Sequence, residues 1–310
     1  MRMSDANESV FADCCYGRSS VLGWARTDRI FEQALSRIRY RIHPAPDLNA
    51  WAFMDRESTM RVVEINTGTL LELRNLIERV LEWQELFTAL RGPKHGRCGV
   101  ESLVLAACID LIVWHEIQHH GLGHVGYFHG VGDPGFSDRS SQGGTSRSRM
   151  RMYYLDRRAC ELSADSQAIQ FMLRFQRDLR HDRRSRYYRI PRTELLQLFS
   201  FSVYLLFAAI GAREPKFHRF IETSCAAGSG MPDKARSPYP HSGVRAMQIH
   251  RLLEHSCFQS WIHQDRRTVL QGLTLAVRLA KSGDIAFNVF DPISDEPEFL
   301  ERENHRIIDH

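Results

Sequence analysis

Residues 100–120 read VESLVLAACIDLIVWHEIQHH, a long and strongly apolar run that ends in a polar cluster. Apolar residues occupy nearly every side of a helix drawn through it, which is typical of a helix buried at the centre of a domain. Gly121 and Gly123 follow directly, and glycine commonly ends a helix. The sequence therefore predicts a buried central helix over 100–120, with polar residues in its last turns.

The polar residues at the end of this helix have the spacing of a metal site. His115, Glu116 and His119 form the pattern H-E-x-x-H. Residues four apart share a helix face, so both imidazoles can bind one ion while Glu116 leans toward the open coordination position. Zinc lowers the pKa of a bound water to about 7, and a neighbouring carboxylate can accept its proton and return it to a leaving amine. The pattern could occur by chance among 15 histidines, but burying such polar groups in an apolar helix is costly unless they are paired or bind a metal.

A third protein ligand is offered by the segment ELSAD, residues 161–165. Glu161 and Asp165 lie one turn apart on the same face of a helix predicted over 153–179. Glu161 can bind the metal, and Asp165 can accept the N–H of a metal-binding histidine and so fix its tautomer. An acidic pair of this kind usually forms a solvated helix face, but its place after H-E-x-x-H favours a metal-binding role. We therefore expect one Zn2+ ion, held by His115, His119 and Glu161.

Two further histidines near the motif are not expected to bind the ion. A three-histidine site requires a histidine six residues after His119, whereas His124 is five residues after it and follows the glycine pair that ends the helix. His120 points to a different face of the helix, so we expect it to be structural or to lie near the cleft.

The other segments predict a mainly α (α+β) fold with a small sheet beside the central helix. Residues 49–54 (NAWAFM) and 61–66 (RVVEIN) are β-type runs, which predict a β-hairpin or a pair of adjacent strands. Residues 121–148 are rich in glycine, serine and arginine and predict a long mobile loop. Apolar residues at helical spacing occur over 27–39, 70–90, 153–179, 195–211, 243–255 and 260–281.

Composition favours an ordinary globular protein of a reducing compartment. The chain has 310 residues, 43% of them hydrophobic, and a net charge of +4 with arginines interleaved among acids, which gives no case for nucleic acid as a partner. Its seven cysteines are odd in number and form no C-x-x-C pair, as expected for free thiols. No secretory signal is visible near the polar residues 1–7, so we expect a cytoplasmic location.

Residues 195–211 raise the question of a membrane span. The run LLQLFSFSVYLLFAAIG has no charge and is close to the shortest length that crosses a bilayer. Polar residues within the run lower its hydrophobicity. Arginines flank it on both sides, whereas a membrane span usually has them mainly on the cytoplasmic side. A buried core helix is the favoured interpretation, with membrane association left as the alternative.

Two motifs together resemble a known family. Residues 115–124 (HEIQHHGLGH) fit H-E-x-x-H-x-x-x-G-H, and residues 160–165 (CELSAD) contain E-x-x-A-D. Both are similar to motifs of the HtpX-like and CAAX-prenyl-protease metallopeptidases, which are gluzincins, and of their soluble bacterial and phage-related relatives. Asn49-Ala50-Trp51, followed by VVEINTG, is similar to the family's Asn-Ala-Phe strand and the adjacent strand that ends in glycine.

A weaker correspondence lies near the C-terminal end. Tyr239-Pro240 with Arg245 is similar to the family's His-Pro motif, which has an arginine six residues after the histidine. Tyr239 stands where the family usually has histidine, so the resemblance implies a proton donor of different identity. The resemblance implies that Tyr239, His241 or Arg245 helps hold the oxyanion of the reaction. It also implies that the strand near 62–66 is an edge that pairs with an extended substrate peptide.

The resemblance implies a zincin-like metallopeptidase domain over 47–282, between an unassigned N-terminal segment (1–46) and an acidic tail (283–310). The family's several membrane spans are missing, which suggests a soluble relative similar to the Lit-like phage-exclusion peptidases. The expected function is a zinc endopeptidase acting on a protein or peptide substrate. The alternatives are a catalytically silent, zinc-stabilised interaction module and an integral-membrane peptidase. The intact Glu116 argues against the silent module, because a structural zinc needs no base.

Overall fold

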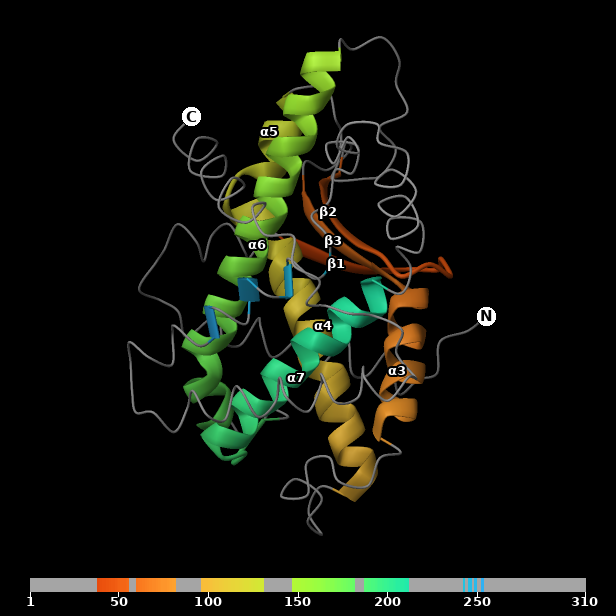
Figure 1. Cartoon of the computed structure of the whole chain (residues 1–310), viewed down its shortest axis with the longest axis vertical. Helices are drawn as coiled ribbons and strands as arrows, with labels where there is room; N and C mark the ends of the chain where they lie inside the picture. Colours follow the sequence, from red (N-terminus) through yellow and green to blue (C-terminus); the bar gives the residue numbers. More distant parts are fainter. Residues whose placement is uncertain are drawn as a thin grey trace, which may run out of the picture.

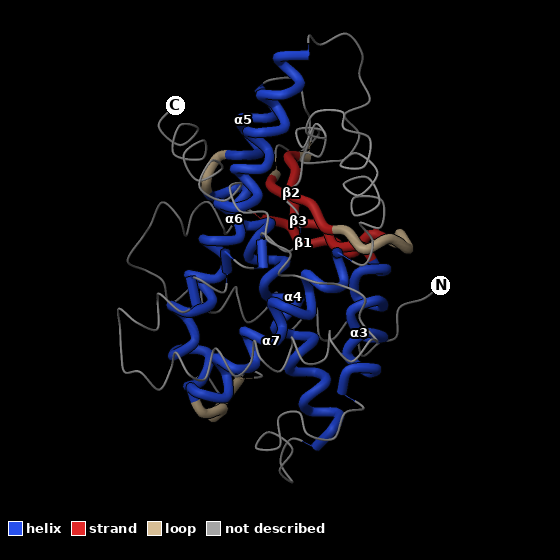
Figure 2. The backbone as a smooth tube through the Cα atoms, in the orientation of Figure 1, coloured by secondary structure: helices blue, strands red, loops and turns tan. Residues whose placement is uncertain are grey.

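The structure is a computed structural model that describes residues 38–55, 60–81, 96–130, 147–181 and 187–211, together with seven single positions between 242 and 253. The described residues are mainly helical, with three strands gathered on one side of the helices (Figure 2). The strands are β1 (Ile38–His43), β2 (Ala50–Met54) and β3 (Arg61–Asn66). The helices are α3 (Thr67–Leu81), α4 (Gly96–Gly121), α5 (His124–Gly130), α6 (Arg147–His181) and α7 (Arg192–Gly211).

The predicted central helix is confirmed as α4 (Figure 1). It contacts the other four helices and the strands β2 and β3. Every residue from 103 to 120 is buried, which accounts for the apolar residues on all of its sides. The helix begins four residues earlier than expected and ends at Gly121.

The apolar segment that raised the membrane question forms α7. This helix packs against α4, α3 and α6, and its side chains contribute to the same hydrophobic core as those of α4. By length and composition α7 could cross a membrane, but 83% of its most apolar 18-residue window is buried inside the protein. Its burial is that of a core helix.

The two predicted strands are confirmed as neighbours, and the sheet has a third strand. β2 pairs antiparallel with β3, and β1 pairs parallel with the other side of β3. The strand order is therefore β1-β3-β2. The expectation that residues 62–66 form an edge strand is wrong, because β3 lies in the middle. Its apolar residues are buried on both faces of the sheet, as a central strand requires: Val62, Val63 and Ile65.

β1 lies within the segment 1–46, to which the sequence assigned no role. Residues 38 and 39 belong to this strand, so the helix expected over 27–39 is wrong at its end; residues 27–37 lie outside the described part of the chain. The helix expected over 70–90 is α3, which begins at Thr67, and residues 82–95 are also outside the described part.

The turn from β3 into α3 is closed by contacts with the segment before β2. The backbone nitrogen of Gly68 donates to the carbonyl of Ala45 at 2.9 Å. The hydroxyl of Thr69 donates to the carbonyl of Asn49 at 2.8 Å and accepts from its backbone nitrogen at 2.8 Å. A Cβ atom at Gly68 would lie 2.1 Å from the carbonyl oxygen of Pro46, so only glycine fits there.

Part of the segment expected as a loop is helical. Gly123 has a φ of 78°, a left-handed conformation that ends α4 and lets the chain start α5 at His124. Val125 and Phe128 are buried, and α5 packs against α4 and β2. The apolar residues among the glycines explain why 124–130 folds; residues 131–146 lie outside the described ranges. Within the helix expected over 243–255 the six described positions are helical, and 260–281 and the tail 283–310 are not described.

Candidate metal centre

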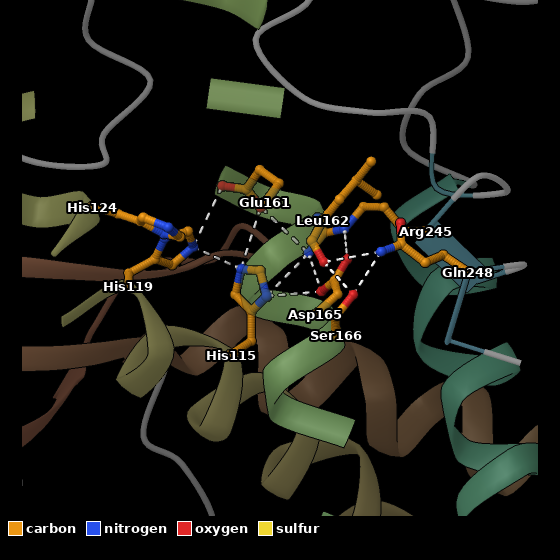
Figure 3. A network of polar contacts seen from close by, with 9 residues as sticks. All are labelled: His115, His119, His124, Glu161, Leu162, Asp165, Ser166, Arg245 and Gln248. Atoms are coloured by element: carbon orange, nitrogen blue, oxygen red, sulfur yellow. Dashed lines mark hydrogen bonds and ion pairs between the residues drawn. The ribbon is translucent and has the colours of Figure 1, made fainter. Parts of the chain in front are cut away.

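Three side chains that could hold a metal ion lie together between α4 and α6 (Figure 3). Nε2 of His119 lies 3.0 Å from Nε2 of His115. The carboxylate oxygens of Glu161 lie 3.3 Å from Nε2 of His115 and 3.6 Å from Nε2 of His119. The candidate ligand atoms all lie within 4.8 Å of one another, and all three residues are buried. The structure thus brings together the three residues that the sequence predicts as ligands.

Two packed helices produce this arrangement. His115 and His119 are one turn apart on α4, and their rings meet edge to face with centroids 4.6 Å apart. Glu161 comes from α6, which packs along α4. Buried side chains also lie on either side of Glu161 along α6: Ala159, Cys160 and Ala164.

Burial and the neighbouring charges shift the pKa of each of the three residues. Burial lowers the pKa of the His115 imidazole, but Asp165 and Glu161 outweigh burial and raise this pKa to about 10. Burial would raise the pKa of Glu161, yet its hydrogen bond with His115 and the charge of Arg245 lower it. Burial and the charge of His115 hold the pKa of His119 well below its usual range. Two imidazoles and a carboxylate are a common donor set for zinc, so these residues fit such an ion.

Asp165 and Arg245 enclose the outer side of His115. Nδ1 of His115 lies 2.8 Å from Oδ1 of Asp165, a distance at which it donates a hydrogen bond. Arg245 donates to both carboxylate oxygens of Asp165, at 2.7 and 2.9 Å, and also lies 3.4 Å from Oε2 of Glu161. Burial raises the pKa of Asp165, but Arg245 and His115 outweigh it and lower this pKa to about 2. Asp165 therefore stays ionised and holds the ring of His115 in one orientation.

Glu116 is buried beside this cluster on α4, with an exposed fraction of 6%. Burial raises the pKa of its carboxyl group to about 7, opposed by the charge of His115 and aided by that of Glu161. Glu116 is not one of the three grouped ligands. A carboxyl group with a pKa near neutrality can both accept and donate a proton at neutral pH.

The two histidines that the sequence excluded as ligands contact other groups. Nδ1 of His124 lies 3.0 Å from Nδ1 of His119, on the side of that ring away from Glu161. Nε2 of His120 lies 3.0 Å from the carbonyl oxygen of Val62 and joins α4 to the sheet. Neither belongs to the grouped ligands.

Of the three residues expected to help hold the oxyanion, the structure describes one. Tyr239 and His241 lie outside the described residues, so their roles stay predictions. Arg245 is described, and its guanidinium group is engaged by Asp165 and Glu161 and stacks over the ring of Phe207, 5.1 Å from its centroid.

The sequence did not predict the contacts that attach the segment around Arg245 to α6. Gln248 donates to the hydroxyl of Ser166 at 2.6 Å and to the carbonyl of Leu162 at 3.3 Å (Figure 3). Arg245 and Gln248 are three residues apart and face the same helix. Their spacing of three residues was the sign in the sequence that both side chains could contact one neighbouring helix.

Comparisons with protein-family models, with curated proteins and with solved structures find no match. The likeness to the metallopeptidases therefore stays an expectation from the sequence motifs, and the geometry of His115, His119 and Glu161 is that of a possible metal site.

Proposed function

We propose that this chain is a zinc-dependent endopeptidase that hydrolyses a peptide bond of a protein or peptide substrate. One arrangement carries the proposal: His115, His119 and Glu161 converge within 4.8 Å, and Glu116 follows His115 on the same buried helix. Structural zinc sites usually have four protein ligands, whereas catalytic sites have three and one open position. Among the described residues, the group contains three.

Each nearby residue has a part in this reaction. A zinc ion bound there supplies a Lewis acid that polarises a carbonyl and makes water acidic enough to lose a proton near neutral pH. Glu116 accepts that proton and passes it to the leaving amine, a transfer suited to a pKa raised to about 7 by burial. Asp165 keeps Nε2 of His115 turned toward Glu161. Arg245 binds Asp165 and Glu161, so we assign it to positioning these carboxylates.

We place the substrate peptide along β2. This strand forms one edge of the sheet, and within the described ranges no strand pairs with its outer side. β2 also packs against α4 and α5, the two helices that meet at His119 and His124. An extended peptide can add to such an edge through main-chain hydrogen bonds.

Two other functions make different predictions. A silent, zinc-stabilised module gives no role to the carboxyl group of Glu116. An integral-membrane peptidase requires α7 to cross a bilayer, whereas 83% of its most apolar window is buried inside the protein. The experiment described next separates the peptidase from the silent module, because it compares the wild type with a variant that differs only at the proposed base, Glu116.

The experiment expresses the full chain as wild type, as Glu116→Gln and as Glu101→Gln. Glu101 lies near the other end of α4, so its variant makes the same chemical change away from the cluster. New protein termini are mapped across the proteome of the expressing cells, and zinc is measured in each purified protein. We expect equal zinc in all three, new termini with wild type and Glu101→Gln, and a loss of cleavage rate of about 10²–10⁴-fold for Glu116→Gln.

Full cleavage by a zinc-loaded Glu116→Gln protein would overturn the assigned mechanism. Zinc at one equivalent without new termini from the wild type, in cells or against a peptide library, would support the silent module instead.

A further inference from the structure

We infer that His124 is a positioning residue of the metal centre: it accepts the hydrogen bond from Nδ1 of His119 and so presents Nε2 of His119 to the ion. The inference rests on the metal site of the proposed function but not on peptide hydrolysis. It gives a role to a histidine that sequence spacing excludes as a ligand.

The geometry supports a single N–H···N hydrogen bond between the two rings (Figure 3). Nδ1 of His119 and Nδ1 of His124 are 3.0 Å apart, which is a normal hydrogen-bond distance. The ring centroids are 5.2 Å apart at an interplanar angle of 61°. Both residues are buried, with exposed fractions of 1% and 2%, so water does not compete easily for this contact.

The direction of this hydrogen bond follows from what the opposite nitrogen of His119 faces. Nε2 of His119 lies 3.0 Å from Nε2 of His115 and 3.6 Å from Glu161, so it is the nitrogen that offers a lone pair to an ion. A neutral imidazole has one hydrogen, which must then be on Nδ1. Nδ1 of His124 must therefore accept, and His124 must carry its own hydrogen on Nε2.

The fold holds His124 at this position through the turn between α4 and α5. Gly123, with its positive φ, redirects the chain, and its carbonyl accepts from the backbone nitrogen of Tyr127 at 2.9 Å. The hydroxyl of Tyr127 donates to Asp156 of α6 at 2.8 Å. The ring of Phe128 lies under the guanidinium group of Arg157, at 5.6 Å. These contacts fix α5, and His124 is its first residue.

The two metal-binding histidines are thus oriented in different ways. His115 donates to a carboxylate, Asp165, that is itself neutralised by Arg245. His119 donates to a neutral ring. A fourth carboxylate is therefore not added to a buried cluster that already contains Glu116, Glu161 and Asp165.

The test uses three variants of the full chain. In His124→Asn the amide oxygen takes nearly the place of Nδ1 and keeps an acceptor, whereas His124→Leu has none. Glu101→Gln is the control, because Glu101 lies near the other end of α4, away from His119 and His124. Zinc dissociation constants are measured by competition with a chelator, and far-ultraviolet circular dichroism checks the fold. We expect His124→Leu to weaken zinc binding by about 10–100-fold, with His124→Asn and Glu101→Gln close to wild type.

A second readout needs no substitution of the residue under test. Long-range ¹H–¹⁵N spectra of the zinc-loaded wild type report the tautomer of each histidine ring, and we expect hydrogen on Nδ1 of His119 and on Nε2 of His124. Hydrogen on Nδ1 of His124, or His124→Leu with wild-type affinity, overturns the inference while leaving the metal site intact. If His124→Leu does not fold, the spectra decide. A wild type that binds no zinc overturns both the inference and the proposed metal site. Loss of peptidase activity alone changes neither the zinc dissociation constant nor the histidine tautomers.

Discussion

Nδ1 of His115 and Oδ1 of Asp165 are 2.8 Å apart, and Asp165 follows Glu161 by one turn of the same helix. One helix therefore supplies both a candidate ligand and the carboxylate that orients another ligand. Because the two groups are fixed to the same backbone, their relative geometry depends little on the rest of the fold.

Replacing Asp165 tests this coupling. Asp165→Asn keeps the size of the side chain but removes the charge that His115 and Arg245 contact, so we expect zinc affinity to fall by about 10–100-fold with the fold retained. Chelator competition measures the affinity. Ser166→Ala, which removes the neighbouring contact with Gln248, is the control and should bind zinc like the wild type. Equal affinities for Asp165→Asn and wild type would show that the hydrogen bond does not orient His115.

Metal uptake should release a proton from His115. Burial lowers the pKa of this residue, but Asp165 and Glu161 raise it to about 10, so the imidazole is protonated at neutral pH. His119 has a pKa well below its usual range and releases none. Because only the neutral ring binds a metal, about one proton should leave His115 per ion, and affinity should rise about tenfold per pH unit as the pH approaches that pKa.

Calorimetry of zinc binding in buffers with different ionisation enthalpies measures this release. The apparent binding enthalpy should change in proportion to the buffer's ionisation enthalpy. The same enthalpy in every buffer would contradict the assignment of a protonated His115.

Gly68 should be intolerant of any side chain. A Cβ atom there meets the backbone of Pro46 at 2.1 Å, and this backbone cannot move without disturbing the turn between β3 and α3. We expect Gly68→Ala to lower the free energy of unfolding by about 1–3 kcal/mol. Gly126→Ala is the control, because its Cβ has no atom within 4 Å and alanine favours the helix α5. Urea denaturation followed by circular dichroism compares them; a loss as large for Gly126→Ala would refute the steric cause.

α7 should behave as part of a folded core. We expect the chain, expressed and lysed without detergent, to remain in the supernatant after high-speed centrifugation, because the apolar face of α7 is already covered by α3, α4 and α6. Recovery only after detergent extraction, with resistance to alkaline carbonate, would instead indicate a membrane span.

Local patterns were enough to predict α4, α7 and the neighbouring strands β2 and β3. Each of these has an apolar period or run that fits within its own length. The central position of β3 in the sheet was missed because it depends on β1. This parallel partner lies more than twenty residues earlier in the sequence, since Ile38 pairs with Arg61. The adjacent Val62 and Val63, buried on opposite faces, were the local sign that β3 is central.

The candidate metal site was predictable where its residues share a helix or a short motif. His115, Glu116 and His119 are fixed by helical spacing, and Glu161 and Asp165 by the spacing of the next motif. The contact of Arg245 with Asp165 joins residues 80 apart, and no local pattern reports it. The contact between His119 and His124 depends on the positive φ of Gly123, which turns a residue beyond the helix end back toward the site.

A crystal structure of the zinc-loaded chain, with diffraction data collected on both sides of the zinc absorption edge, would show directly which residues hold the ion. We predict one anomalous peak at about 2.0–2.2 Å from Nε2 of His115, Nε2 of His119 and a carboxylate oxygen of Glu161. No peak at these three residues, or a zinc ion held by a different set of side chains, would refute the proposed metal site.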